Sequence, residues 1–244
     1  MSKKRIFKKL WVFGDSYTTP YKCVNVEDSF WGITAQHLVI PIVVNCSRES
    51  NSFESVMHLL VTMQAEINWK EDLVFVGVPP LERITVFDNR ADTVYLGNSF
   101  NTSDWSKETF EIISHRGLVS KQHYGGDKEL IIHNDRSWVE TQALKNIFLI
   151  TSWLDSVKAN YLILNLSKNL DENNSWGPSE FLLNYCQQHR RCLLFKDTYH
   201  GINVGINKPI DYDCIGWNGH HGADGNRYFF EKSLTPLLKR NKFC

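Results

Sequence analysis

A glycine–aspartate–serine turn, Gly14-Asp15-Ser16, follows the first apolar run of the chain, Leu10 to Phe13. Glycine permits the tight backbone path that such a turn needs. The turn presents the hydroxyl of Ser16 just past the end of a strand and leaves nearby backbone N–H groups unpaired, and such groups can hold an oxyanion. The pattern therefore indicates a serine nucleophile. A helix N-cap formed by the Asp-Ser pair is the alternative interpretation.

Two adjacent histidines near the end of the sequence, His220 and His221, are the candidates for a base. A serine hydroxyl at its ordinary pKa is a weak nucleophile, so it needs a base within hydrogen-bonding reach. The chain contains 9 histidines, and one histidine alone is a weak signal. This pair stands out because it precedes an amphipathic stretch, Tyr228 to Leu238, that is typical of a final helix.

Together the two motifs resemble the SGNH hydrolases, also called GDSL esterases and lipases. In that family the nucleophile lies in an N-terminal strand–Gly-Asp-Ser–helix unit. The histidine precedes the last helix and is followed five positions later by a glycine. His220 and Gly225 match this spacing, with His221 as the alternative base. The resemblance spans nearly the whole chain and implies hydrolysis of short acyl esters, such as acetyl esters, by a Ser16–histidine pair.

The resemblance also implies an oxyanion hole, and here the chain departs from the family pattern. The expected donors are the N–H of Ser16, a glycine N–H after the second strand and an asparagine side chain after the third. Ser50 matches the glycine position, and Asn51 or Asn45 is a substitute donor. Pro79 stands at the asparagine position and has no donor. One missing donor costs about 100- to 1000-fold in rate, so weak activity is expected.

The orienting carboxylate of the family is a second departure. The family places an aspartate two or three residues before its histidine, where this chain has Asn218. An asparagine can accept a hydrogen bond from imidazole, but it cannot stabilise the imidazolium by charge. Asp211 and Asp213 are the nearest carboxylates, and some members of the family work with a Ser–His dyad.

Apolar runs and amphipathic segments alternate along the chain. This alternation predicts a three-layer α/β/α fold with a parallel sheet of about five strands, the flavodoxin-like fold of the SGNH hydrolases. Leu10–Phe13 is expected at the centre of the sheet. The predicted strands are Leu10–Phe13, Val39–Asn45, Asp72–Gly77, Tyr161–Leu166 and Cys192–Phe195. The predicted helices are Ser29–His37, Phe53–Ile67, Thr141–Val157, Ser179–Gln188 and the stretch that ends at Leu238.

Residues 81 to 138 interrupt this alternation and contain two short β-prone stretches, Thr93–Leu96 and Leu130–His133. We therefore predict a single domain, residues 1–244, with an insertion at about 81–138. The insertion follows the third strand, so it is expected at the carboxyl edge of the sheet, where α/β sheets bind ligands. A lid over a substrate and a surface for a homo-oligomer or another assembly partner are both open interpretations.

The composition limits the classes of partner. The chain has 27 basic and 27 acidic residues, which gives no indication of a nucleic-acid or acidic lipid surface. No stretch reaches membrane-spanning length, and the run Leu10–Phe13 is too short for the core of a signal peptide, so a cytoplasmic location is expected. The 6 cysteines lack paired or metal-like spacing, so free thiols are expected and neither a metal ion nor a cofactor is.

Two functions are compatible with these motifs. The first is a serine esterase acting on a short acyl ester, for example of a carbohydrate that stacks on Trp105, Tyr124 or Trp138. The second is an SGNH-like structural or interaction module with little or no activity, such as a virion component encoded by a bacteriophage, which Pro79 and Asn218 favour. No Gly-x-Gly-x-x-Gly or P-loop spacing supports a nucleotide-binding domain.

Overall fold

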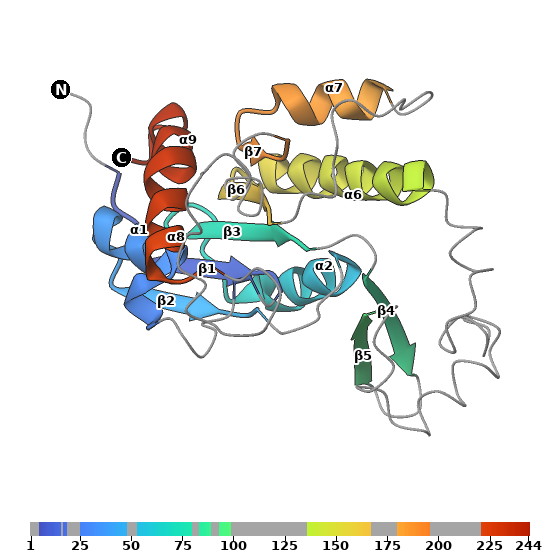
Figure 1. Cartoon of the computed structure of the whole chain (residues 1–244), viewed down its shortest axis with the longest axis horizontal. Coiled ribbons are helices and arrows are strands. Elements are labelled where there is room, and N and C mark those ends of the chain that lie inside the picture. Colours follow the sequence, from blue (N-terminus) through green and yellow to red (C-terminus); the bar gives the residue numbers. More distant parts are fainter. Residues whose placement is uncertain are drawn as a thin grey trace.

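The predicted parallel sheet is present (Figure 1). A computed structural model describes residues 5–15, 17–18, 25–47, 53–79, 83–88, 93–98, 136–166, 180–195 and 221–244. Five strands form a parallel sheet in the order β2-β1-β3-β6-β7. Their bounds are β1 Lys9–Phe13, β2 Ile42–Asn45, β3 Leu73–Val78, β6 Asn160–Asn165 and β7 Cys192–Leu193. The predicted α/β/α fold class is confirmed.

Helices cover both faces of the sheet. Successive residues of a strand point to opposite faces, and in this sheet both sets of side chains are apolar and buried. In β1, Leu10 and Val12 belong to the core on one face, whereas Trp11 and Phe13 belong to the core on the other. The first core is closed by α1 Phe30–Leu38, α8 Ala223–Phe229 and α9 Thr235–Arg240. The second is closed by α2 Phe53–Thr62, α6 Arg136–Ser156 and α7 Glu180–Gln188.

Two expectations about the strands were wrong. The central strand is β3 rather than β1, because the chain runs from β1 outward to β2 and then returns to the other side of β1. The predicted strand Val39–Asn45 is shorter and lies at an edge of the sheet. Val39 instead ends α1 with a left-handed backbone at φ 58° and is 72 % exposed, and Ile42 is 48 % exposed. β-Branched residues favour extended backbone whether or not both faces are buried.

An antiparallel hairpin, formed by β4 Arg83–Asp88 and β5 Thr93–Asn98, follows β3. β5 confirms the β-prone stretch at Thr93–Leu96, and β4 contacts α2. Figure 1 shows the hairpin beyond the carboxyl end of β3. Leu130–His133 and much of the predicted insertion lie outside the described residues, so the single-domain organisation with its insertion stays a prediction.

The C-terminal helical segment changes its hydrogen-bonding register between α8 and α9. Residues Phe230–Leu234 are π-helical, and the N–H of Thr235 bonds to the carbonyl oxygen of Phe230. Pro236, in the first turn of α9, has no N–H, and its ring clashes with the carbonyl four residues earlier. We attribute the wider turn to this proline, because such turns arise where the regular helical bonds are interrupted.

Within the described part of the chain, Cys186, Cys192 and Cys244 are free thiols, as predicted. Burial raises the pKa of the Cys186 thiol to about 12 and that of Cys192 well above its ordinary value. Burial also raises the pKa of the Tyr161 hydroxyl. In each case the low-polarity core disfavours the charged form.

These raised pKa values predict a loss of stability in alkali. The folded state holds the thiol proton of Cys186 more tightly than the unfolded state does. The stabilisation is therefore complete below the ordinary thiol pKa of 9.0 and is lost as the pH rises toward about 12. We expect the melting temperature to fall above about pH 9, and a thiol reagent to modify the exposed Cys244 before Cys186. A melting temperature that stays constant from pH 8 to pH 10.5 would contradict this expectation.

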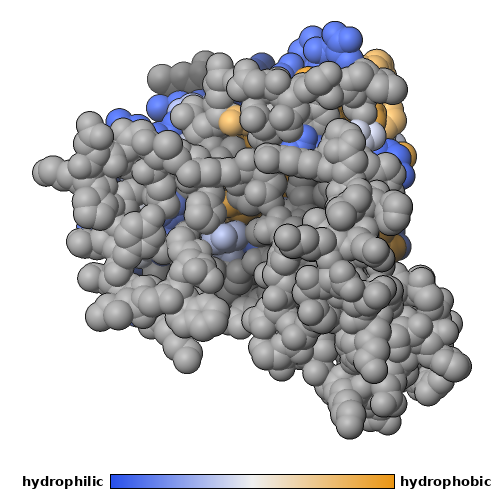
Figure 2. Space-filling model, turned by 45° about the vertical axis from the view of Figure 1, so that its right-hand side comes forward, coloured by the Kyte–Doolittle hydropathy of each residue, from blue (hydrophilic) through white to orange (hydrophobic). Residues whose placement is uncertain are grey.

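The described part of the surface seen in this view carries both hydrophobic and hydrophilic side chains. Figure 2 shows hydrophobic atoms in small patches beside hydrophilic ones. Large hydrophobic residues exposed in the described ranges include Val26, Ile42, Leu149 and Phe181. Every helix within those ranges is too short or too polar to cross a bilayer.

Candidate active site

The carboxyl ends of β1 and β3 flank the point where the strand order reverses. The chain runs from β1 to the edge strand β2 on one side and then to β3 on the other. Open α/β sheets bind ligands in the crevice at such a switch point. Gly14 and Asp15 directly follow β1, and Pro79 directly follows β3. The sheet topology therefore places the ends of the Gly-Asp-Ser turn and of β3 where a reaction centre is expected.

Hydrogen bonds join Asp15 to Tyr17 and Thr18 in the turn after β1. The buried carboxylate of Asp15 accepts the N–H of Tyr17 at 3.1 Å. The main-chain carbonyl oxygen of Asp15 accepts the N–H of Thr18 at 3.0 Å and the Thr18 hydroxyl at 2.7 Å. A Cβ at Gly14 would overlap the Thr18 side chain, so the turn requires glycine there. Tyr17 and Thr18 lie in a turn, and the residues that would continue a helix lie outside the described residues, so the helix N-cap interpretation stays open.

Side chains from β2 and α1 fix the far end of this turn at Thr18. The amide nitrogen of Asn45, the last residue of β2, donates to the carbonyl oxygen of Thr18 at 2.8 Å. Trp31 of α1 donates its indole N–H to the same oxygen, also at 2.8 Å. The hydroxyl oxygens of Ser47 and Thr18 lie 2.6 Å apart. Asn45, a substitute oxyanion donor in the sequence, thus binds the turn itself.

The histidine-bearing segment is fixed to the start of α1. His221 is 4 % exposed and lies just before α8, whose N-cap is Gly222. The side-chain amide of Asn226 donates to the carbonyl oxygens of His221 and Gly222, each at 3.0 Å. Its oxygen accepts the N–H of Phe30, the first residue of α1, at 3.0 Å. The sequence patterns did not single out Asn226.

The imidazole of His221 packs on Gly225. A Cβ at Gly225 would lie 2.7 Å from Nδ1 and 2.8 Å from Cγ of His221. The glycine that the sequence pairs with His220 by a spacing of five is therefore in contact with His221, four positions away. Of the two candidate bases, His221 is the one that the structure describes. The other predicted site residues lie outside the described residues: Ser16, Ser50, Asn51, Asn218 and His220.

Replacing Gly225 with alanine is expected to displace the His221 imidazole, since the new methyl group would overlap the ring. A displacement of about 1 Å can cost on the order of 100-fold in rate. We expect ester hydrolysis to fall by about 10- to 100-fold while the circular dichroism spectrum is retained. Asp224→Ala, at the exposed neighbouring position, is the control and should leave kcat/KM unchanged. Equal rates for the two variants would contradict this role of Gly225.

The end of β3 offers no oxyanion donor at Pro79, which is buried and has no N–H. The neighbouring strand β6 ends in Asn165, paired with Val78. The Asn165 amide nitrogen donates to the carbonyl oxygen of Leu194 at 2.7 Å, which joins β6 to the residue after β7. Asn165 is thus engaged in holding two strands together.

A second group of titratable side chains lies at the amino end of β6, away from the turn after β1. Asp155 accepts the Tyr161 hydroxyl at 3.0 Å and lies 3.2 Å from Nε2 of His189. Arg191 lies 3.3 Å from the same carboxylate and donates to the carbonyl oxygen of Ala159. Because Tyr161 is the second residue of β6, this His–Asp pair is at the opposite edge from Gly14 and cannot orient a base there.

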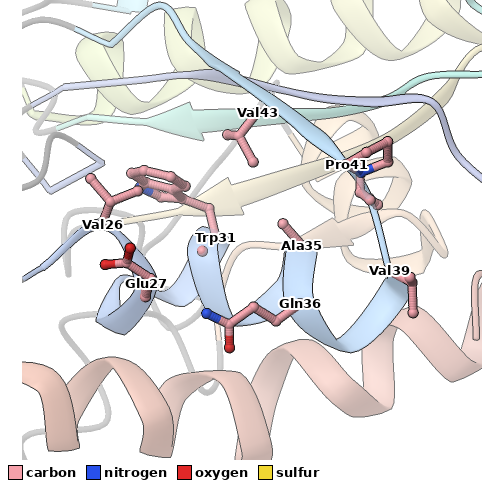
Figure 3. A pocket seen from close by; sticks show the side chains of 10 residues that line it. Val26, Glu27, Trp31, Ala35, Gln36, Val39, Pro41 and Val43 are labelled. Carbon is pink, nitrogen blue, oxygen red and sulfur yellow. The ribbon is translucent and has the colours of Figure 1, made fainter.

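An apolar groove between α1 and β2 has a volume of about 480 Å³ (Figure 3). Figure 3 shows Trp31 and Ala35 on α1, with Val43 and Pro41 on the strand side. Glu27 is the only ionisable residue of its lining, which contains neither serine nor histidine. None of the candidate catalytic residues is part of this lining. No cluster of metal-binding side chains occurs among the residues that the structure describes.

Comparisons with known proteins concern the fold. No protein-family model and no curated protein sequence matches the chain. Similar solved structures include TesA, with 15% identity, coverage of 95% of this chain and 98% of that chain, and a TM-score of 0.49. A lipolytic G-D-S-L family protein from Veillonella parvula is 12% identical, covering 93% of this chain and 96% of its own, with a TM-score of 0.45.

The psychrotrophic esterase EstA from Pseudoalteromonas sp. is 8% identical over 95% of this chain and 97% of its own, with a TM-score of 0.48.

Proposed function

We propose that the chain is a serine ester hydrolase with Ser16 as nucleophile and His221 as base. The supporting observation is the common attachment of two segments to the start of α1. Trp31 binds the turn that contains Ser16, and the preceding residue, Phe30, binds the segment that carries His221. Both segments are therefore held by adjacent residues of the same helix, and a nucleophile and its base need such fixed relative positions.

In the proposed reaction, His221 removes the proton of the Ser16 hydroxyl while the serine oxygen attacks the acyl carbon. The tetrahedral intermediate then collapses, the bond to the alcohol breaks, and the imidazolium returns its proton to the leaving oxygen. Water, deprotonated by the same imidazole, attacks the acyl-enzyme and releases the carboxylic acid and Ser16. His220 takes the role of base in the alternative arrangement.

The proposed oxyanion hole consists of the N–H of Ser16 with Ser50 and Asn51 as further donors. Pro79 contributes none, so we propose a slow enzyme. The proposed substrate is a short acyl ester, for example an acetyl group on a carbohydrate. The cytoplasmic location and the bacteriophage origin also remain proposals from the sequence.

Covalent labelling tests the proposal. A fluorophosphonate reagent phosphonylates a serine, with loss of fluoride, only when a base activates the serine hydroxyl. We expect mass spectrometry to locate one adduct on Ser16 of the native protein, with none after heat denaturation and much less in His221→Gln. Labelling of another residue, or no labelling of a folded protein, would contradict the proposal.

The second candidate function is an SGNH-like interaction module without activity. The buried Pro79 at the end of β3 favours it, because proline stands where the family has an asparagine side-chain donor and has neither such a side chain nor an N–H. Failure of both labelling and ester hydrolysis in a folded protein would support this candidate.

A further inference from the structure

One buried side chain, that of Asn226, connects the histidine segment to α1. We propose that Asn226 is a positioning residue, which sets the place of His221 relative to the turn that carries Ser16. This inference rests on the proposed function, in which His221 acts on Ser16. It adds a residue that neither the motifs nor the spacing of the sequence indicated.

Asn226 uses both ends of its amide. It is 3 % exposed, and its two N–H hydrogens have two acceptors, the carbonyl oxygens of His221 and Gly222 at 3.0 Å each. Its oxygen accepts the N–H of Phe30 at 3.0 Å. Buried amides with donors and acceptor engaged hold a single geometry, since any movement leaves a polar group unpaired. The backbone of His221 is thereby fixed to α1.

The path from Asn226 to the turn at Thr18 is short. Phe30 donates its N–H to the side-chain oxygen of Asn226, and the next residue, Trp31, donates its indole N–H to the carbonyl oxygen of Thr18 at 2.8 Å. The imidazole of His221 is in turn packed on Gly225, the residue before Asn226. One helix start therefore determines the separation of the turn from the base.

The variants Asn226→Asp and Asn226→Ala separate the role of the amide nitrogen from that of the amide oxygen. Asn226→Asp keeps an oxygen for the N–H of Phe30 but removes the donors to His221 and Gly222. Asn226→Ala removes all three hydrogen bonds. Both changes release the backbone of His221, and only the second also releases α1.

Asn241 provides a matched control within the same C-terminal helical segment. Its amide nitrogen donates to the carbonyl oxygens of Leu237 and Arg190, each at 2.9 Å, and it is 9 % exposed. Asn241→Ala therefore removes two donor bonds of a buried amide, as Asn226→Asp does, but at the other end of the segment, away from His221. A purely structural role would give Asn226 and Asn241 the same effects.

The first experiment measures kcat, KM and melting temperature on a short aryl ester. For Asn226→Ala and Asn226→Asp we expect kcat to fall by about 10- to 100-fold with KM within about twofold. Asn241→Ala should lower the melting temperature by a similar amount but keep kcat within about twofold. A folded Asn226→Asp with wild-type kcat would overturn the inference, and so would an equal kcat loss in Asn241→Ala.

The second experiment does not require activity. The imidazole resonances of His221 are assigned by their loss in His221→Gln, and their NMR shifts are followed in each variant. We expect both Asn226 variants to move these resonances and Asn241→Ala to leave them in place. Resonances that stay unmoved in Asn226→Asp would overturn the positioning role. A wild type without Ser16-dependent hydrolysis defeats the proposed function alone, because the NMR result still decides on Asn226.

Discussion

Ser16→Ala should lower the hydrolysis of p-nitrophenyl acetate to the rate of the buffer. Loss of the nucleophile in a serine–histidine site costs on the order of 10³-fold or more in kcat. The wild-type rate is itself expected to be low, because Pro79 supplies no oxyanion donor. The measurement is kcat/KM on short-chain aryl esters and then on acetylated sugars.

Ser152→Ala is the matched control for this substitution. Ser152 is exposed on α6 and donates to the carbonyl oxygen of Phe148 within the same helix. Its loss should leave the rate unchanged. Equal activity of Ser16→Ala and wild type would show that the hydrolysis comes from another residue or from a contaminant. A fast wild type would instead show that other donors, Asn51 first among them, complete the oxyanion hole.

His221→Gln is expected to lower kcat by a similar amount, on the order of 10³-fold, because the serine then lacks its base. Glutamine keeps much of the size and polarity of histidine but cannot accept a proton. Wild-type protein and His221→Gln are compared by kcat, KM and melting temperature. A large loss of kcat at an unchanged melting temperature is the expected result.

Two further histidine variants identify the base. His220→Gln should have the smaller effect, because Gly225 contacts the ring of His221. His37→Gln, an exposed position on α1, should have none. A larger loss in His220→Gln than in His221→Gln would assign the base to His220, in agreement with the five-residue spacing to Gly225.

The order of strands and helices could be predicted because hydrophobic periodicity is local. Leu10 and Val12 face one core and Trp11 and Phe13 the other, so the run reads as a strand buried on both faces. The position of each strand in the sheet could not be predicted this way. It depends on which side of β1 each crossover returns to, and the edge strand β2 has as β-branched a sequence as a central one.

The Gly-Asp-Ser turn was visible in the sequence, but the residues that fix it were not. Thr18 and Asn45 are 27 residues apart, and Phe30 and Asn226 are 196 residues apart. Polar residues that meet over such separations leave no periodic pattern in the sequence, so their contacts could not be predicted from it. The five-residue spacing to Gly225 pointed to His220, and it gave no sign that the ring of His221 contacts this glycine.

The bond between Phe30 and Asn226 also bears on the order in which parts of the fold can form during synthesis. The 196-residue separation means that nearly the whole sequence must leave the ribosome before the two partners can meet. The pairing of β1, β2 and β3 needs only the first third of the chain, and amino-terminal parts fold first during translation. A nascent chain can therefore pair these three strands before the segment that carries His221 has been synthesised, so the bond that joins this segment to α1 forms late.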